Sequence, residues 1–159
     1  MSTREGYLDG AGIRVALVVS RFNDVVTAKL LSGAEDCLER HGCKADCRTV
    51  VRVPGAWELP LAAKKLAAGG GFDAIVALGA LIRGETPHFD YLAAQVARGL
   101  AQTGLDSGIP TIFGVLTTDT TDQAVARAGA KTGNKGWEAA LSALEMVNLF
   151  RDLERRPSD

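Results

Sequence analysis

The chain has 159 residues, 47% hydrophobic and 23% charged, which is typical of one domain with an ordinary core. With 18 Lys and Arg against 19 Asp and Glu, its net charge of -1 leaves no basic excess for nucleic acid or acidic membranes. The longest apolar runs are of strand length, so we expect no bilayer-spanning helix. The N-terminal M-S-T-R-E-G lacks the apolar core of a signal peptide, and we expect a cytoplasmic protein.

Three cysteines, Cys37, Cys43 and Cys47, form an odd set without a secretion signal, which argues against a disulfide framework. His41 lies near two of them in the sequence, so a zinc site is a conceivable alternative. Zinc requires four ligands in a closed set, and no further cysteine pair or histidine motif supplies them. We therefore expect ordinary thiols and no metal.

Apolar periodicity predicts alternating strands and helices. Residues 1–12 form an arm whose short segment 6–9 is weakly strand-like, so it is either a tail or an addition to another sheet edge. The strands are expected at 14–19, 47–53, 74–78 and 111–116. The helices are expected at about 24–41, 61–68, 92–105, 122–128 and 137–153. One α/β domain over 13–153 follows, with a parallel sheet of about four strands and right-handed crossovers.

Three local patterns sharpen this prediction. Strand 47–53 alternates apolar and charged residues, which indicates an edge strand. Asn23 or Asp24 is expected to cap the first helix. The last helix carries two apolar stripes and needs two partners, so we expect its second partner to be another subunit. Residues 154–159 form a charged tail.

Unusual segments follow each predicted strand: 20–23, 54–58, 83–88 and 117–121. The carboxyl ends of parallel strands meet at one edge of an open sheet, where such folds bind their ligands. Four such segments therefore predict a binding site at this edge.

The stretch from Gly79 to Tyr91 combines a strand end, a glycine turn, a capped helix start and a histidine. Backbone N–H groups of residues 83–86 are suited to phosphate, with Thr86 as the helix cap and Pro87 as the first helical residue. His88 lies at the positive end of the helix dipole, which favours a neutral imidazole able to act as a base. A capped helix bearing a surface histidine is the alternative.

The remaining candidates are similarly open. Phe22 and Trp57 can stack on a flat ring or belong to the core. Glu58 can bind hydroxyls or cap a helix, and Arg127 can be a solvated surface cation. The chain contains no dinucleotide fingerprint, Walker A motif, serine elbow or paired Cys–His nucleophile. The residues alone indicate a small molecule with a phosphate and a ring, with His88 as acid–base.

Several long motifs carry a family resemblance over nearly the full chain: S-R-F-N at 20–23, V-P-G-A-W-E-L-P at 53–60, G-A-L-I-R-G-E-T-P-H-F-D-Y at 79–91, F-G-V-L-T-T at 113–118 and A-G-A-K-T-G-N-K-G at 128–136. In order and spacing the chain resembles the lumazine synthases. The resemblance implies a three-layer α/β/α sandwich with the flavodoxin-like strand order 2-1-3-4. It also implies condensation of 5-amino-6-(D-ribitylamino)uracil with 3,4-dihydroxy-2-butanone 4-phosphate to 6,7-dimethyl-8-ribityllumazine, without a metal or organic cofactor.

Carried over to this sequence, the resemblance makes His88 the proton shuttle and Glu138 a group that polarises it. The pyrimidine ring and ribityl chain would contact Phe22, Asn23, Ala56, Trp57, Glu58, Gly79, Ala80, Leu81 and Ile82. The phosphate pocket would contain Glu85 and Thr86. A neighbouring subunit would supply Phe113, Arg127 and Lys135, with Arg127 binding phosphate.

The resemblance also implies a homo-oligomer. In this family the compact loop at 129–136 goes with pentamers assembled into an icosahedral 60-mer, with riboflavin synthase as possible cargo. The arm would then extend a neighbour's sheet. Two other functions stay open on the same fold: a flavin- or lumazine-binding module, and a shell protein without activity.

Overall fold

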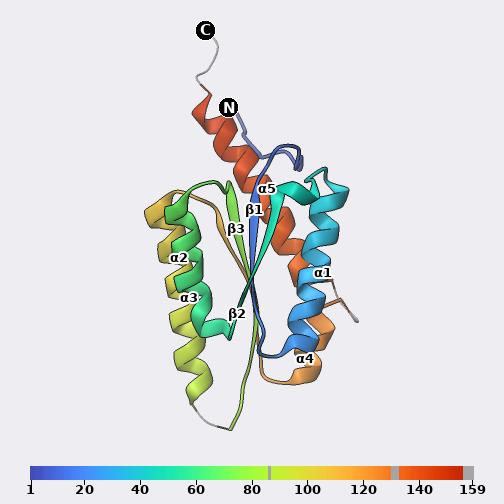
Figure 1. Cartoon of the computed structure of the whole chain (residues 1–159), viewed down its shortest axis with the longest axis vertical. Coiled ribbons are helices and arrows are strands. Elements are labelled where there is room, and N and C mark those ends of the chain that lie inside the picture. Colours follow the sequence, from blue (N-terminus) through green and yellow to red (C-terminus); the bar gives the residue numbers. More distant parts are fainter. Residues whose placement is uncertain (86, 130–132, 156–159) are drawn as a thin grey trace.

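The computed structural model describes residues 1–85, 87–129 and 133–155 (Figure 1). Its described part contains a parallel sheet of four strands in the order β2-β1-β3-β4. The strands are β1 (Val15–Ser20), β2 (Arg48–Val53), β3 (Ala74–Ile82) and β4 (Thr111–Thr118). The predicted strand order 2-1-3-4 is confirmed.

Helices cover both faces of this sheet (Figure 1). One face carries α1 (Asp24–Arg40), α4 (Thr121–Arg127) and α5 (Lys135–Glu154), and the other carries α2 (Leu59–Gly69) and α3 (His88–Ser107). Short 3-10 turns lie at Ala45–Cys47 and Ala56–Glu58. In the described part of the chain, no helix is both long and apolar enough to cross a membrane.

Strand burial explains the hydrophobic pattern. Every residue of β1 is buried, with Leu17 packed toward α1 and α5 and Val18 toward α2 and α3. A strand covered on both faces needs apolar residues at every position, which is why β1 is a continuous apolar run. Strand β2, in contrast, ends the sheet and exposes several side chains, as its alternating sequence predicted.

Strands β3 and β4 extend beyond their predicted ends. Gly79 to Ile82 pair in register with Val115 to Thr118, so Gly79 lies inside a strand and not in a turn. A Cβ on Gly79 would stand 3.0 Å from both Leu59 Cδ1 and Ser20 Oγ. The glycine therefore serves close packing between the sheet and α2, and β3 continues to Ile82, past its predicted end at Leu78.

Two predicted helix starts also differ. Asn23 precedes α1 in a left-handed conformation (φ 64), and its side chain does not cap that helix. The amide instead donates to the Ala80 carbonyl at 3.2 Å and so ties β1 to β3. Helix α3 begins at His88, with Pro87 preceding it and not occupying the first helical position. Thr86, the predicted cap, lies outside the described residues.

The N-terminal arm lies along α5 of its own chain. The side-chain amide of Asn148 donates to the carbonyls of Tyr7 (2.7 Å) and Asp9 (2.9 Å), and Arg4 pairs with Asp152 at 3.7 Å. Residues 1–10 form no strand here. Addition of the arm to a neighbour's sheet stays a prediction. Of the predicted tail, 156–159 lie outside the described residues.

Candidate active site

The segments that follow the strands meet at one sheet edge, as the sequence predicted. The Arg21 N–H donates to the Val53 carbonyl at 2.8 Å, which joins the end of β1 to that of β2. The Arg83 N–H donates to the Thr118 carbonyl at 2.8 Å and joins the ends of β3 and β4. The sheet hydrogen bonding thus continues into the loops and fixes their relative positions.

A cleft of about 760 Å³ opens at this edge on the side of α2 and α3. We call it the aromatic cleft. Seven of the predicted substrate contacts and the predicted proton shuttle His88 line it; the seven are Phe22, Asn23, Ala56, Trp57, Ala80, Leu81 and Ile82. Its other lining residues are Gly55, Gly84, Phe89, Tyr91, Leu92 and Gln95. The lining is largely apolar and aromatic, which suits a flat ring.

Three aromatic side chains of this lining are strongly exposed: Phe22 (72%), Trp57 (59%) and Tyr91 (71%). Trp57 belongs to the 3-10 turn Ala56–Glu58, which Glu58 stabilises because its carboxylate accepts the Gly55 N–H at 3.2 Å. Large exposed rings are costly on a monomer's surface, so their grouping at a cleft indicates a binding surface.

Helix α3 presents His88 to the cleft together with residues that the sequence analysis did not select. Tyr91, Leu92 and Gln95 follow His88 at spacings of three, four and seven, which places all four on one helical face. Helical periodicity counted from His88 would have found them. The acid–base candidate therefore lies on a rigid helix beside two further polar side chains.

Arg83 holds the start of α3 in place. Its guanidinium pairs with Asp119 (2.9 Å) and Asp90 (3.1 Å), and its Cζ lies 4.5 Å from the centre of the Phe89 ring. The hydrogen bonds that it donates to the carboxylates of Asp90 and Asp119 raise the pKa of the Arg83 guanidinium. The backbone N–H of Arg83 donates to the Thr118 carbonyl, so it is not free to bind a phosphate. The predicted contribution of this N–H to phosphate binding was wrong.

The aromatic cleft contains no lysine or arginine among the described residues that line it. A phosphate requires cations or free N–H donors, and among the described residues of this lining His88 alone has a side chain that can carry a positive charge. Among its described lining residues, the ring-binding side chains are therefore not accompanied by a lysine or arginine that could bind a phosphate.

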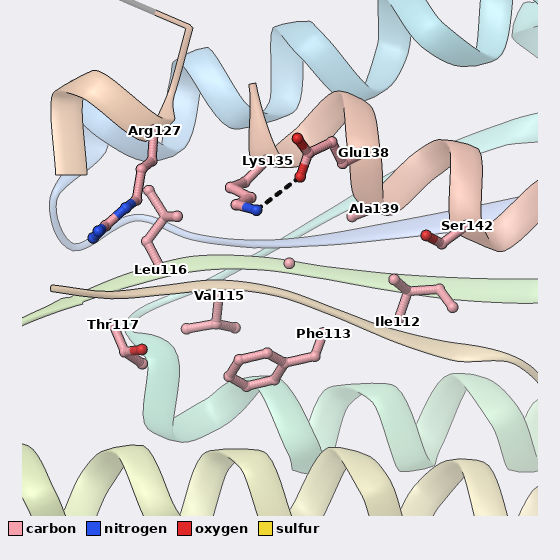
Figure 2. Close-up of a pocket in the computed structure, with 11 residues that line it drawn as sticks. Ile112, Phe113, Val115, Leu116, Thr117, Arg127, Lys135, Glu138, Ala139 and Ser142 are labelled. Carbon is pink, nitrogen blue, oxygen red and sulfur yellow. Dashed lines mark ion pairs between the residues drawn. The ribbon is translucent and has the colours of Figure 1, made fainter. Parts of the chain in front are cut away.

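The cations lie in a second cleft of about 460 Å³ along edge strand β4, which we call the cationic cleft (Figure 2). It brings together the predicted residues Phe113, Arg127, Lys135 and Glu138. Figure 2 shows Arg127 on α4 and Lys135 on α5 on one side of β4, with Phe113 on the other side. The Lys135 ammonium pairs with the Glu138 carboxylate at 2.9 Å.

The two linings share no residue, so within one chain the predicted site is divided. Glu138 lines the cationic cleft and His88 the aromatic cleft, so the predicted pairing of these two residues stays a prediction. Glu58, Gly79 and Glu85 belong to neither lining, and Thr86 lies outside the described residues. The contacts predicted for these residues stay predictions.

The cysteines and His41 make other contacts. The Cys43 thiol donates to the Ile13 carbonyl at 3.3 Å, and His41 Nδ1 lies 2.6 Å from the Cys37 carbonyl. Burial raises the pKa of the Cys37 thiol to about 11, and the Asp36 carboxylate adds to this shift. Among the described residues, no group of three or more His, Cys, Asp and Glu side chains is placed to hold a metal ion.

The family model described as 6,7-dimethyl-8-ribityllumazine synthase matches residues 12–151. The chain belongs to this family. Lumazine synthases are transferases of riboflavin biosynthesis that act on small molecules and form homo-oligomers. The resemblance found in the sequence motifs is thus confirmed at the level of the family, and the matched range covers both clefts.

Proposed function

We propose that this lumazine synthase condenses 5-amino-6-(D-ribitylamino)uracil with 3,4-dihydroxy-2-butanone 4-phosphate. The products are 6,7-dimethyl-8-ribityllumazine, phosphate and water. The observation that carries the proposal is the division of the site: flat rings and His88 in one cleft, Arg127 and Lys135 in the other. One substrate is a flat pyrimidine and the other is a phosphate ester, so each half suits one of them.

The aromatic cleft holds the pyrimidine. Phe22 stacks on its ring, and backbone groups of Ala80 to Ile82 line the ring edge. The ribityl chain extends along Ala56 and Trp57, with Glu58 close by in the same 3-10 turn. Position 56 carries no hydroxyl, so the contacts made there are backbone contacts.

The cationic cleft of an adjacent copy holds the phosphate. Arg127 donates charge-assisted hydrogen bonds to the phosphate oxygens, and Lys135 adds a second positive charge. Phe113 closes the apolar side of the site. Glu85 and Thr86 complete the pocket from the chain that carries His88.

The reaction consists of proton transfers between positioned substrates. The substrate's amine attacks the ketone to form an imine and release water, and removal of a carbon-bound proton then expels phosphate. Tautomerisation, attack by the second amine and dehydration close the ring. His88 moves protons, and Glu138 of the adjacent copy polarises it. No step requires a protein nucleophile, so proximity supplies much of the rate.

We propose pentamers in which each interface completes one site, assembled into an icosahedral 60-mer. Support comes from the short 129–136 loop and from the exposed aromatic rings that a neighbour would cover. The arm, which forms no strand on its own chain, would add to a neighbour's sheet, and riboflavin synthase would be the cargo. Light scattering separates a pentamer from a 60-mer.

The decisive experiment mixes the purified protein with both substrates and follows the absorbance of the lumazine product. We expect product formation that requires both substrates. Flavin or lumazine binding without turnover would identify a binding module instead, and assembled shells without turnover would identify an inactive shell protein.

A further inference from the structure

The side-chain amide of Asn134 connects three helices. Its nitrogen donates to the Lys29 carbonyl of α1 at 2.9 Å and to the Ala128 carbonyl after α4 at 3.1 Å. Its oxygen accepts the N–H groups of Gly136 (2.8 Å) and Trp137 (3.1 Å) at the start of α5. A primary amide has two donor hydrogens and an acceptor oxygen with two lone pairs, so all of its hydrogen-bonding capacity is used.

These contacts place Asn134 between the two cations of the cationic cleft. Arg127 is the last residue of α4 and directly precedes Ala128, whereas Lys135 is the first residue of α5 and directly follows Asn134. The backbones of Ala128 and Asn134 also form an antiparallel bridge. The Glu138 N–H donates to the Asn134 carbonyl at 3.1 Å, and Glu138 then pairs with Lys135. Asn134 thus sets the distance between the Arg127 and Lys135 backbones.

Two glycines leave room for this arrangement. A Cβ on Gly33 of α1 would collide with the Asn134 amide, and a Cβ on Gly136 would collide with the Leu30 backbone. Helices α1 and α5 therefore approach closely on both sides of the amide. A side chain with every hydrogen bond satisfied and little free space around it has one well-defined orientation.

We propose that Asn134 is a positioning residue for the phosphate end of the reaction, acting through Arg127 and Lys135 without touching substrate. The proposal rests on the function proposed above. It also assigns a role to two residues of the G-N-K-G sequence at 133–136: Gly136 allows α5 to approach the Leu30 backbone of α1 closely, and the Asn134 amide aligns the cations.

The test is the Asn134→Ser variant, because Ser still caps α5 but cannot reach both carbonyls. Its matched control is Asn148→Ser on the same helix. This substitution also removes a side-chain amide, in this case one that makes three hydrogen bonds and lies away from both clefts. Arg127→Ala and the Arg127→Ala/Asn134→Ser double variant complete the set. Circular dichroism verifies folding, and steady-state kinetics gives kcat and both KM values on the full-length assembly.

We expect Asn134→Ser to raise the KM for the butanone phosphate about tenfold, the size of one misaligned charge-assisted hydrogen bond. The KM for the pyrimidine should stay near wild type, as should both KM values of Asn148→Ser. In the Arg127→Ala background the effect of Asn134→Ser should shrink, because only the part that acts through Lys135 remains.

If Arg127→Ala raises the KM for the butanone phosphate and Asn134→Ser does not, the positioning role is overturned. No effect of Arg127→Ala would overturn the phosphate site itself. If Asn134→Ser does not fold, Asn134→Asp caps α5 equally well, and Ser142→Asp in the same cleft controls for the added charge. Equal KM increases in these two Asp variants would also overturn the proposal.

Discussion

The division of the site between two clefts predicts that two inactive chains complement each other. One chain carries Phe22→Ala and His88→Ala, which damage the aromatic cleft, and the other carries Arg127→Ala and Lys135→Ala, which damage the cationic cleft. Assembled separately, each chain has only damaged sites. Assembled together, some interfaces combine the intact aromatic cleft of one chain with the intact cationic cleft of the other.

The magnitude follows from the geometry of a closed ring. Each interface draws one cleft from each of two neighbours, so at equal mixing roughly one quarter of the sites take both intact halves. The mixture should therefore recover roughly one quarter of the wild-type activity per site at butanone phosphate concentrations below the wild-type KM. Under these conditions the background from sites without Arg127 is low, because losing its charged hydrogen bonds costs about 1.5–3 kcal/mol, or roughly 10- to 150-fold in affinity.

The two chains are co-expressed with different tags, purified through both tags and assayed for lumazine absorbance. The control mixes wild type with a chain that carries all four substitutions. If the site is shared between chains, both mixtures have roughly one quarter of wild-type activity. If the site lies within one chain, the control mixture has roughly one half of wild-type activity and the complementation mixture has almost none. If the two damaged chains co-assemble but the mixture forms no lumazine, the shared site is refuted.

The fold makes three further predictions. Arg83→Ala should lower kcat by roughly a few fold, because two exposed ion pairs and a stacked ring hold the start of α3; steady-state kinetics measures this, and an unchanged kcat would contradict it. Gly136→Ala should destabilise the fold by about 1–3 kcal/mol through collision with Leu30, whereas Gly104→Ala, whose Cβ has ordinary contacts, should stabilise α3 by up to about 1 kcal/mol. Urea unfolding measures the free energy of unfolding of both variants, and equal changes in this free energy would contradict the collision. The raised pKa of Cys37 stabilises the fold below pH 9, and this contribution should disappear as the pH rises from 9 to about 11. Over this pH range the urea midpoint of Cys37→Ala should therefore fall less steeply than that of the wild type.

Much of the fold could be predicted from local pattern. The unbroken apolar run of β1 predicted a strand covered on both faces, and the alternation in β2 predicted an edge strand. The apolar pattern of a strand depends on how many of its faces are buried, so it can be seen in the sequence of that strand alone. The alternation of strands and helices then left few possible topologies.

The ends of elements depended on partners that are distant in the sequence. Strand β3 continues through Gly79 to Ile82 because β4 pairs with it to the end, although glycine locally favours a turn. Asn23 bonds across to Ala80 and not to the helix it precedes. In both cases a tertiary hydrogen bond outweighs a local preference of about 1 kcal/mol.

The sequence by itself determined the family, the sheet edge at which the aromatic cleft opens and about half of the residues that line the two clefts. Only the tertiary structure decided how these residues are distributed. It separated His88 from Arg127 and Lys135, engaged Arg83 in ion pairs and placed Tyr91 beside His88. The physical reason is that residue type and spacing define what a side chain can bind, whereas the packing of the helices on the sheet determines which side chains meet.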